Sequence, residues 1–228
     1  MRLIRFIVVS ICILLLTGSS SSILDNSDRD KLLIEVIAYV MQRGHYDPKQ
    51  INDEFSKHVF KNFIEGIDGQ HRFFLQSDIN NFKRYEREID DQINVADVSF
   101  FNFTYDRLIS RMNQVKEFYG DLLDEPFDFE VKDSINLNFD EHVYARTLNG
   151  LKNLWRKRFK LSTLEYLSDL VNQEKLEQEK DSSYQIKSKI VLEKEARSKT
   201  RENIESYFEI FEEVDRKDWF SIYVNVIT

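Results

Sequence analysis

The chain has 228 residues, of which 42% are hydrophobic and 13% aromatic, and its formal net charge is −8. This length allows one sizeable domain or two small ones. The acidic balance and the lack of a long basic stripe argue against nucleic acid as a partner.

Residues 1–22 have the pattern of a secretory signal peptide. Arg2 and Arg5 form a basic start, residues 6–16 are an almost continuous apolar run, and residues 18–22 are small. The run is too short for a comfortable membrane span, so we expect an exported, periplasmic protein. The alternative is an uncleaved anchor, which would tether the protein to the inner membrane. We expect membrane contact only through this segment.

The rest of the composition favours a helical domain without disulfides. The only cysteine, Cys12, lies in the apolar run of the signal, so the mature chain would have no disulfide, Cys-ligated zinc or cysteine nucleophile. Its core would depend on 18 Phe and 10 Tyr. With only two prolines and six glycines, long helices are favoured over a β-sandwich or barrel. We expect an all-α, irregular multi-helix domain with an aromatic-rich core over residues 27–228.

Apolar residues at helical spacing predict four amphipathic helices in the first half of the chain. Gly44, Gly66 and Gly120 are expected to end the first, second and fourth, and Ser77 to cap the third. The expected buried residues are Leu33, Val36, Ile37 and Val40 in the first helix; Phe55, Val59, Phe60, Phe63 and Ile64 in the second; Ile79, Phe82, Ile89 and Ile93 in the third; and Tyr105, Leu108, Ile109, Met112 and Tyr119 in the fourth.

Residues 121–138 break the helical pattern. Pro126 lacks a backbone N–H and restricts Glu125 before it, so helix is disfavoured there. The alternating pattern that follows predicts either short extended pieces or a loop that pins Phe127 and Phe129 onto the core. Helix is expected to resume near Glu141.

The C-terminal half is expected to contain further helices and a charged arm. The sequence from Ser162 to Glu165 fits a capping box, which allows a new helix to start there. Residues 172–200 are rich in Glu, Lys, Gln and Ser, and predict a solvated helical arm or a flexible connection outside the core. Two last helices would pack through Arg201, Ile204, Phe208 and Phe211, and then, after an Asp215 cap, through Trp219, Ile222, Tyr223 and Val226. Because this apolar pattern runs to Thr228, we expect a continuation or a truncation there.

The residues offer no motif for catalysis, a metal or a cofactor, so we assign no catalytic, metal-binding or cofactor-binding residue. The four histidines, none in a metal-binding spacing, are His45, His58, His71 and His142. We expect His58 to be packed or at the surface and His71 to face solvent. No G-x-S-x-G elbow or Gly-rich phosphate loop is present.

One basic and aromatic segment, LWRKRFK at residues 154–160, allows two interpretations. It could be a patch that binds an anionic ligand or a partner protein. Alternatively, its helix could bury Leu151, Leu154, Trp155 and Phe159 while the Arg and Lys side chains stay in water. The second interpretation is favoured, because one cluster of four cations is common on an acidic protein.

Three stretches carry a further signal when they are taken together in order. In residues 53–82, a helix that ends in Ile67-Asp68 leads into the apolar loop 73–75 and then into Ser77-Asp78. The second stretch, 154–160, and the third, 207–228, contribute the residues Trp155, Arg156, Arg158 and Lys160, and Asp218, Phe220, Tyr223 and Asn225. Together they resemble the N-terminal domain of the tail-specific, or carboxy-terminal processing, proteases of the bacterial periplasm. Gly69 stands where that family usually has proline, and a turn accommodates either residue.

The resemblance implies a part of a protease without its catalytic centre. Members of the family place a PDZ domain and a serine peptidase domain after this region, and the nucleophilic serine and its activating lysine lie in the later domain. Neither domain is present in this chain, so no catalytic residue is transferred and the chain's own enzymatic activity stays open. The implied partners are those two domains, protein substrates or an adaptor protein. The alternative is a stand-alone periplasmic interaction module without hydrolase activity.

The apolar loop of the first stretch has a physical interpretation of its own. Phe73, Phe74 and Leu75 are expected to fold back as a plug over the ends of the flanking helices. Burial of each such side chain stabilises a fold by about 1.5–3 kcal/mol.

Overall fold

The computed structural model describes residues 26–44, 50–136, 138 and 143–228. Every regular element within these residues is a helix, which confirms the all-α prediction. In chain order the elements are α2 (Asn26–Tyr39), the π-helix η1 (Val40–Gly44), α3 (Asp53–Asp68), α4 (Gln76–Phe82), the 3-10 helix η2 (Lys83–Tyr85), α5 (Ile89–Asn94), α6 (Ser99–Asp124), α7 (Leu148–Lys180), α8 (Lys189–Glu213) and α9 (Arg216–Ile227).

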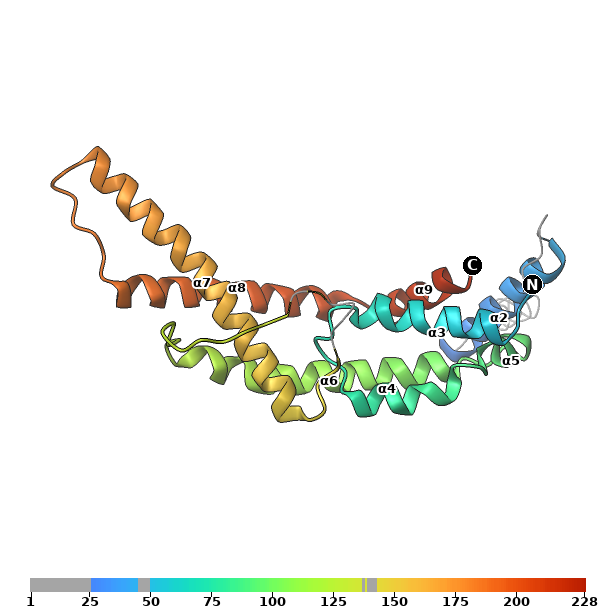
Figure 1. The fold of residues 1–228 in the computed structure, drawn as a ribbon. Coiled ribbons are helices and arrows are strands. Elements are labelled where there is room, and N and C mark those ends of the chain that lie inside the picture. The colour runs from blue at the N-terminus through green and yellow to red at the C-terminus, as the bar shows by residue number, and fades with distance from the viewer. Residues whose placement is uncertain (1–25, 45–49, 137, 139–142) are drawn as a thin grey trace, which may run out of the picture.

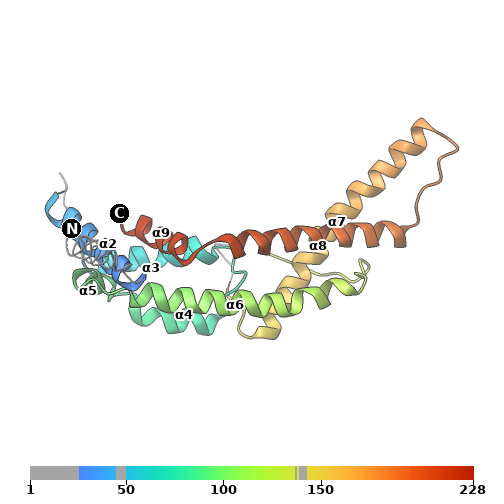
Figure 2. The same cartoon turned by 180° about the vertical axis from the view of Figure 1, so that it is seen from behind.

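The helices form a long, curved body with an arm at one end (Figure 1). α2, α3, α5 and α9 gather at the opposite end, and α6 and α8 extend along the molecule (Figures 1 and 2). α7 crosses α8, and the two helices then diverge into the arm. The C-terminus lies at the same end of the body as α2, because α9 packs on both α2 and α3.

An aromatic core joins α3, α6 and α9, as the composition predicted. Phe63, Phe101 and Tyr223 come from these three helices and are fully buried. The Phe63 and Tyr223 ring centroids are 5.0 Å apart, and those of Phe101 and Phe220 are 4.9 Å apart, both in edge-to-face geometry. Aromatic pairs prefer this arrangement, so the core gains from ring geometry as well as from burial.

The loop between α3 and α4 is buried, as expected for the plug. Phe73, Phe74 and Leu75 are at most 6% exposed. Phe74 packs edge-to-face on Phe82 of α4 with ring centroids 5.1 Å apart, and Phe73 lies 6.1 Å from Trp155 of α7. These side chains therefore contribute to the core from a segment without helical structure.

The predicted buried face of the first helix is wrong at three of its four residues. Leu33, Val36 and Val40 are exposed and Ile37 is half-buried, whereas Ile34 of α2 and Met41 of η1 are buried. Both sets have helical spacing, so periodicity could not select between them. Packing selects the second set, because α2 rests on α5 and α9.

The predicted third helix is divided into three elements, and its N-cap lies two residues before the expected Ser77. The N-cap position is Leu75, whose backbone N–H donates to the Asp78 carboxylate at 2.9 Å, whereas Ser77 is exposed. Asp78 is itself buried against Arg111 of α6, with N–O distances of 2.8 and 2.9 Å. The expected buried residues Ile79, Phe82, Ile89 and Ile93 are confirmed.

Two of the expected helix ends do not occur. α6 continues through Gly120 to Asp124, where Glu125 adopts an extended backbone before Pro126. Glycine in a helix costs about 1 kcal/mol relative to alanine, which burial of the neighbouring Phe118 and Leu123 can offset. α3 likewise runs past Gly66 to Asp68.

α7 starts later and runs longer than the sequence indicated. Thr147 is its N-cap, with its hydroxyl oxygen accepting the Gly150 N–H at 3.1 Å, and Glu141 lies outside the described residues. The helix passes Ser162 without a break, because Thr163 is buried and its hydroxyl is 2.9 Å from that of Thr200 on α8. The proposed new helix start at Ser162 is therefore wrong.

Residues 172–200 comprise the end of α7, a connection at 181–188 and the start of α8. Leu192 and Ala196 are buried there with Leu170 in a small cluster separate from the main core. Glu174 is also buried and accepts hydrogen bonds from the Tyr184 hydroxyl and the Lys187 N–H at 3.0 and 2.8 Å. The arm thus has its own small apolar centre and a polar tie to its connecting loop.

The last helix follows the sequence closely. Asp215 is the N-cap of α9, and its N–H donates to the Asp218 carboxylate at 3.1 Å. Trp219 and Tyr223 are buried as expected, whereas Ile222 is half-buried. Val226 is also half-buried, and Phe220 and Ile227 complete the buried face.

Candidate functional site: the Asp68 loop and the arm groove

One carboxylate organises the loop of residues 69–75, here called the Asp68 loop. Asp68, the last residue of α3, accepts backbone N–H groups from Arg72 at 2.7 Å, Phe73 at 3.1 Å and Phe74 at 2.8 Å. Burial raises the pKa of this carboxyl to about 7, although the three N–H donors and the nearby Arg158 guanidinium favour its charged form. Asp68 therefore replaces the backbone partners that a non-helical segment lacks.

His71 occupies a special position in this loop. Its φ is 50°, in the left-handed region that non-glycine residues rarely adopt. Its ring stacks on Tyr144 with centroids 3.8 Å apart, and the residue is half-buried. The expectation that His71 faces solvent is therefore wrong, because the tight turn after Asp68 directs it onto the segment that precedes α7.

Two residues of the basic segment hold the Asp68 loop from α7. The Trp155 indole N–H donates to the carbonyl oxygen of Arg72 at 2.8 Å, and the Arg158 guanidinium donates to the carbonyl oxygen of Gln70 at 2.6 Å. Burial lowers the pKa of Arg158 to about 10, so it stays charged at neutral pH. The second stretch of the sequence motif thus holds the first through backbone contacts.

The remaining cations of the segment bind a second loop, residues 131–135, here called the clamped loop. Arg156 donates two hydrogen bonds to the Asp133 carboxylate at 2.8 and 3.1 Å, and Lys160 adds a third at 2.9 Å. Lys157 donates to the carbonyl oxygen of Ser134 at 2.9 Å. Hydrogen bonds from Arg156 and Lys160 lower the pKa of Asp133 below its usual range.

These contacts decide between the two interpretations of residues 154–160. Leu151, Trp155 and Phe159 are buried and Leu154 is half-buried, in line with the helix interpretation. The cations, however, are not simply in water, because each one binds the chain itself. They are positioned to fasten loops, and the segment does not offer a free basic patch to a partner.

The third stretch completes the junction. The Arg72 guanidinium lies over the ring of Tyr207 at 5.2 Å from its centroid, and Phe73 contacts Phe211 edge-to-face at 6.4 Å. Phe211 stacks in turn on Trp219 of α9 at 5.6 Å. The three stretches that share the family resemblance therefore meet around the Asp68 loop.

This junction offers no reactive constellation. Within the described ranges no group of three His, Cys, Asp or Glu side chains is placed to hold a metal ion. His58 is exposed and lies 2.7 Å from the Asn62 amide, and His45 and His142 are outside the described residues. No helix in the part of the chain that the structure describes is long and apolar enough to span a membrane.

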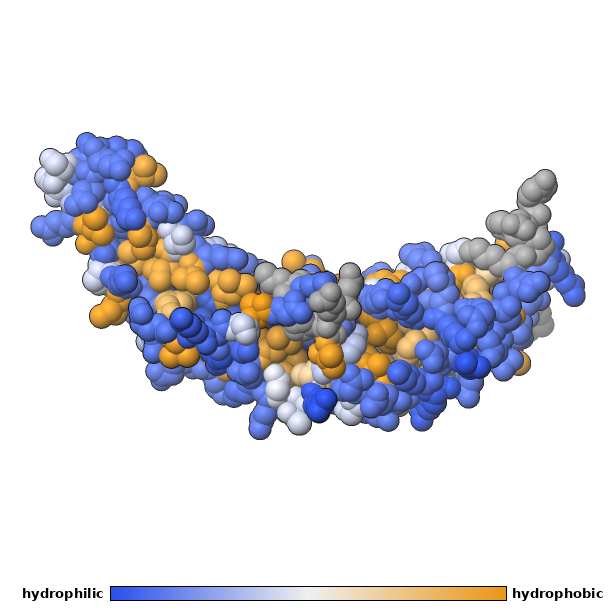
Figure 3. All heavy atoms as spheres, viewed as in Figure 1, coloured by the Kyte–Doolittle hydropathy of each residue, from blue (hydrophilic) through white to orange (hydrophobic). Residues whose placement is uncertain are grey.

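A second feature, an open groove of about 920 Å³, lies beside α7, α8 and the loop that follows α6. We call it the arm groove. Hydrophobic residues gather on this arm of the molecule (Figure 3). The apolar side chains of the groove include Phe127, Phe129, Leu164, Leu167, Val171 and Ile190, and its basic ones include Lys175, Lys189 and Lys194.

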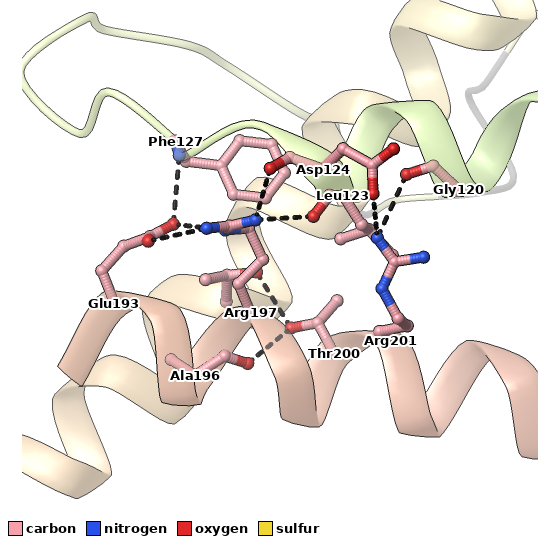
Figure 4. A network of polar contacts seen from close by, with 10 residues as sticks. Gly120, Leu123, Asp124, Phe127, Glu193, Ala196, Arg197, Thr200 and Arg201 are labelled. Carbon is pink, nitrogen blue, oxygen red and sulfur yellow. Dashed lines mark hydrogen bonds and ion pairs between the residues drawn. The ribbon is translucent and has the colours of Figure 1, made fainter. Parts of the chain in front are cut away.

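Arg197 of α8 lines the arm groove, and Figure 4 shows the polar contacts around it. Its guanidinium donates to the carbonyl oxygens of Leu123 at 2.7 Å and Asp124 at 2.9 Å, and it pairs with Glu193 at 2.9 Å. Glu193 also accepts the Phe127 N–H at 3.1 Å. A cation at the C-terminus of α6 satisfies carbonyl groups that have no partner within that helix, and the same network fixes the start of the loop.

Arg201 supports this arrangement one turn further along α8. It donates to the carbonyl oxygen of Gly120 at 3.2 Å and to the Asp124 carboxylate at 2.8 Å (Figure 4). The sequence contained one signal for this network, the i, i+4 spacing of Glu193 and Arg197, but the spacing could not show which helix end the arginines would meet. The arm groove was missed for the same reason.

Comparison with known proteins identifies the same family that the three stretches resemble. Residues 37–228 match the family model described as the tail specific protease N-terminal domain. The chain is also similar to the tail-specific protease of Haemophilus influenzae, with 28% identity over 146 residues. That match covers 64% of this chain and 21% of the relative, so the chain spans only a small part of the relative's length. The chain therefore belongs to the family of tail-specific protease N-terminal domains.

Proposed function

We propose that this domain is the non-catalytic, helical part of a periplasmic tail-specific serine protease, where it scaffolds the binding of protein substrates or an adaptor. One observation carries the proposal. The motif residues Trp155, Arg156, Arg158 and Lys160 all bind loops of the chain itself. Side chains with such contacts fix the shape of this domain, and a catalytic centre in another domain would depend on that shape.

The form of the molecule supports a scaffolding role. The body is long and curved, and it offers an open groove with a substantial apolar lining. Polypeptide ligands suit such surfaces because they can follow a groove and place apolar side chains in it. In this proposal the PDZ and peptidase domains that follow in the family would complete the enzyme, and its Ser/Lys dyad would lie there.

Two measurements test the proposal. The DNA downstream of residue 228 should continue in frame into PDZ and peptidase coding sequence. The purified chain, incubated with a peptide that has an apolar C-terminus, should leave it intact by mass spectrometry. Serine-dependent cleavage by this chain alone would contradict the assignment of catalysis to another domain.

A second function has one observation in its favour. The described residues have their own aromatic core and a separate apolar cluster in the arm, so the domain has the means to fold alone. A stop codon directly after residue 228 would favour a stand-alone periplasmic interaction module without hydrolase activity. N-terminal sequencing of the exported protein would show whether residues 1–22 are removed or retained as an anchor.

A further inference from the structure

The arm groove combines an apolar floor with unmatched positive charge. Lys175, Lys189 and Lys194 lie along it and form no ion pair with any carboxylate of the described residues. The groove's fourth cation, Arg197, is paired with Glu193, and the Asp128 and Glu130 carboxylates of the loop wall form no ion pair with the three lysines. Lysines that an acidic protein leaves unpaired beside an apolar surface complement a ligand that is both acidic and apolar.

The most exposed large hydrophobic side chain of the described residues belongs to this groove. Ile190, at the start of α8, is 82% exposed, and Leu164 across the groove is 45% exposed. A stable fold gains nothing from leaving such side chains in water, and exposed apolar surface with a polar rim is typical of binding sites. Neither residue belongs to the main core or to the Asp68 loop junction.

The dimensions of the groove suit an extended peptide. Along α7 it extends from Leu164 to Lys175, which corresponds to about 16 Å of helix. About five residues of extended chain cover that length. The loop wall carries Asp128 and Glu130, whereas the lysines come from α7 and α8, so the charges would orient the ligand with its acidic side chains toward the helices.

We infer that the arm groove binds an extended polypeptide segment with alternating large apolar and acidic residues. This inference rests on the proposed scaffolding function and names the class of protein segment that the scaffold holds. The apolar side chains of the segment lie against Phe127, Phe129 and Ile190. Its carboxylates face Lys175, Lys189 and Lys194. Binding leaves the peptide intact, because Ser168, the one hydroxyl of the groove lining, forms no hydrogen bond with a basic side chain of the described residues.

Fluorescence anisotropy with a synthetic peptide tests this inference. The probe is a fluorescein-labelled, C-terminally amidated peptide, Asp-Phe-Glu-Leu-Asp-Leu-Glu, and the control peptide has lysine at each acidic position. The acidic peptide is expected to bind the chain more tightly than the basic one. Its affinity should fall when the salt concentration is raised from about 0.05 to about 0.3 M, because salt screens exposed charges. Equal affinity for both peptides would overturn the acidic preference.

Matched variants locate the binding. Ile190→Asp should weaken binding about tenfold or more, whereas Ile210→Asp, which changes a 63% exposed isoleucine elsewhere on α8, should not. The combined change Lys175→Glu, Lys189→Glu and Lys194→Glu should weaken it strongly at low salt. Lys199→Glu, an exposed lysine of the same helix outside the groove, is the charge control. All substituted side chains are exposed, so melting curves should coincide.

The remaining outcomes separate this inference from the proposed function. If Ile190→Asp leaves the affinity for the peptide unchanged, the groove is not the binding site, and the scaffold proposal still stands. Absence of peptide binding, together with self-association that Ile190→Asp abolishes in sedimentation, would show that a second copy of the chain covers the groove, and would also overturn the inference. The downstream reading frame and the hydrolysis assay test the scaffold proposal independently of either result.

Discussion

The indole N–H of Trp155 donates to the backbone carbonyl oxygen of Arg72 at 2.8 Å, although 83 positions separate the two residues. This bond connects the basic segment of α7 to the Asp68 loop. Trp155 is only 3% exposed, so water cannot readily replace the indole as donor. The contact therefore combines a long-range packing role with a polar one.

Trp155→Phe separates the two roles. Phenylalanine keeps most of the apolar burial but leaves the Arg72 carbonyl oxygen without its donor, so we expect a loss of about 1–2 kcal/mol in the free energy of unfolding. Urea unfolding measures it. Tyr166→Phe, which removes a hydrogen bond to exposed Asn203, is the control and should cost much less. Equal losses for both variants would contradict a special role for the indole.

Phe74→Ala tests the plug. The side chain is fully buried and contacts Phe82, so its truncation should destabilise the domain by about 3–5 kcal/mol and lower the melting temperature sharply. Val95→Ala changes a 75% exposed side chain and should leave the melting curve almost unchanged. An unaltered melting temperature in Phe74→Ala would refute the plug.

Asp68 makes stability depend on pH. Its pKa rises from 3.8 to about 7 on folding, mainly through burial. Between these values the folded state keeps a proton that the unfolded state has released, so the contribution of Asp68 to stability is present below about pH 4 and is lost as the pH rises through 7. We expect the melting temperature of the wild type, relative to that of Asp68→Asn, to fall between pH 4 and 7. A constant difference would contradict the raised pKa.

Tyr223→Phe should leave stability unchanged or raise it. The Tyr223 hydroxyl is buried without a hydrogen-bond partner among the described residues, and burial raises the pKa of this hydroxyl above its usual range. Removal of an unsatisfied buried polar group recovers about 1–3 kcal/mol of desolvation cost, if the ring keeps its packing. Chemical denaturation checks the sign. A clear loss of stability would mean that the hydroxyl has a partner in solution.

The sequence predicted the fold class because the relevant signals are local. Helical spacing and few turn residues indicated the helices, and the aromatic residues of 73–75 indicated a buried loop. The sequence did not determine helix faces and helix ends in the same way, because these depend on contacts between distant residues. Ile34 displaced Leu33 on the buried face of α2 when α5 and α9 packed against it, and Thr200 held α7 helical beyond Ser162.

In the candidate site, too, local signals were predictable from the sequence and contacts between distant residues were not. The motif pattern identified Trp155 and Arg158 as important, but the partners of these side chains are carbonyl oxygens, and any residue supplies a carbonyl oxygen. The residue types at the positions that supply these carbonyl oxygens therefore do not reveal the contacts. The arm groove exists because Arg197 and Glu193 fix the loop after α6 against α8, a relationship between segments about seventy positions apart.

The ion pair between Asp30 of α2 and Arg216 of α9, at 2.6 Å, has a consequence for biosynthesis. A polypeptide made from its N-terminus produces α2 long before α9 exists to cover it. Until residue 216 has emerged, α2 can pack on α5 but lacks both this ion pair and its contact with α9. The N-terminal helix of the described residues therefore reaches its complete set of contacts only when the last helix has been made.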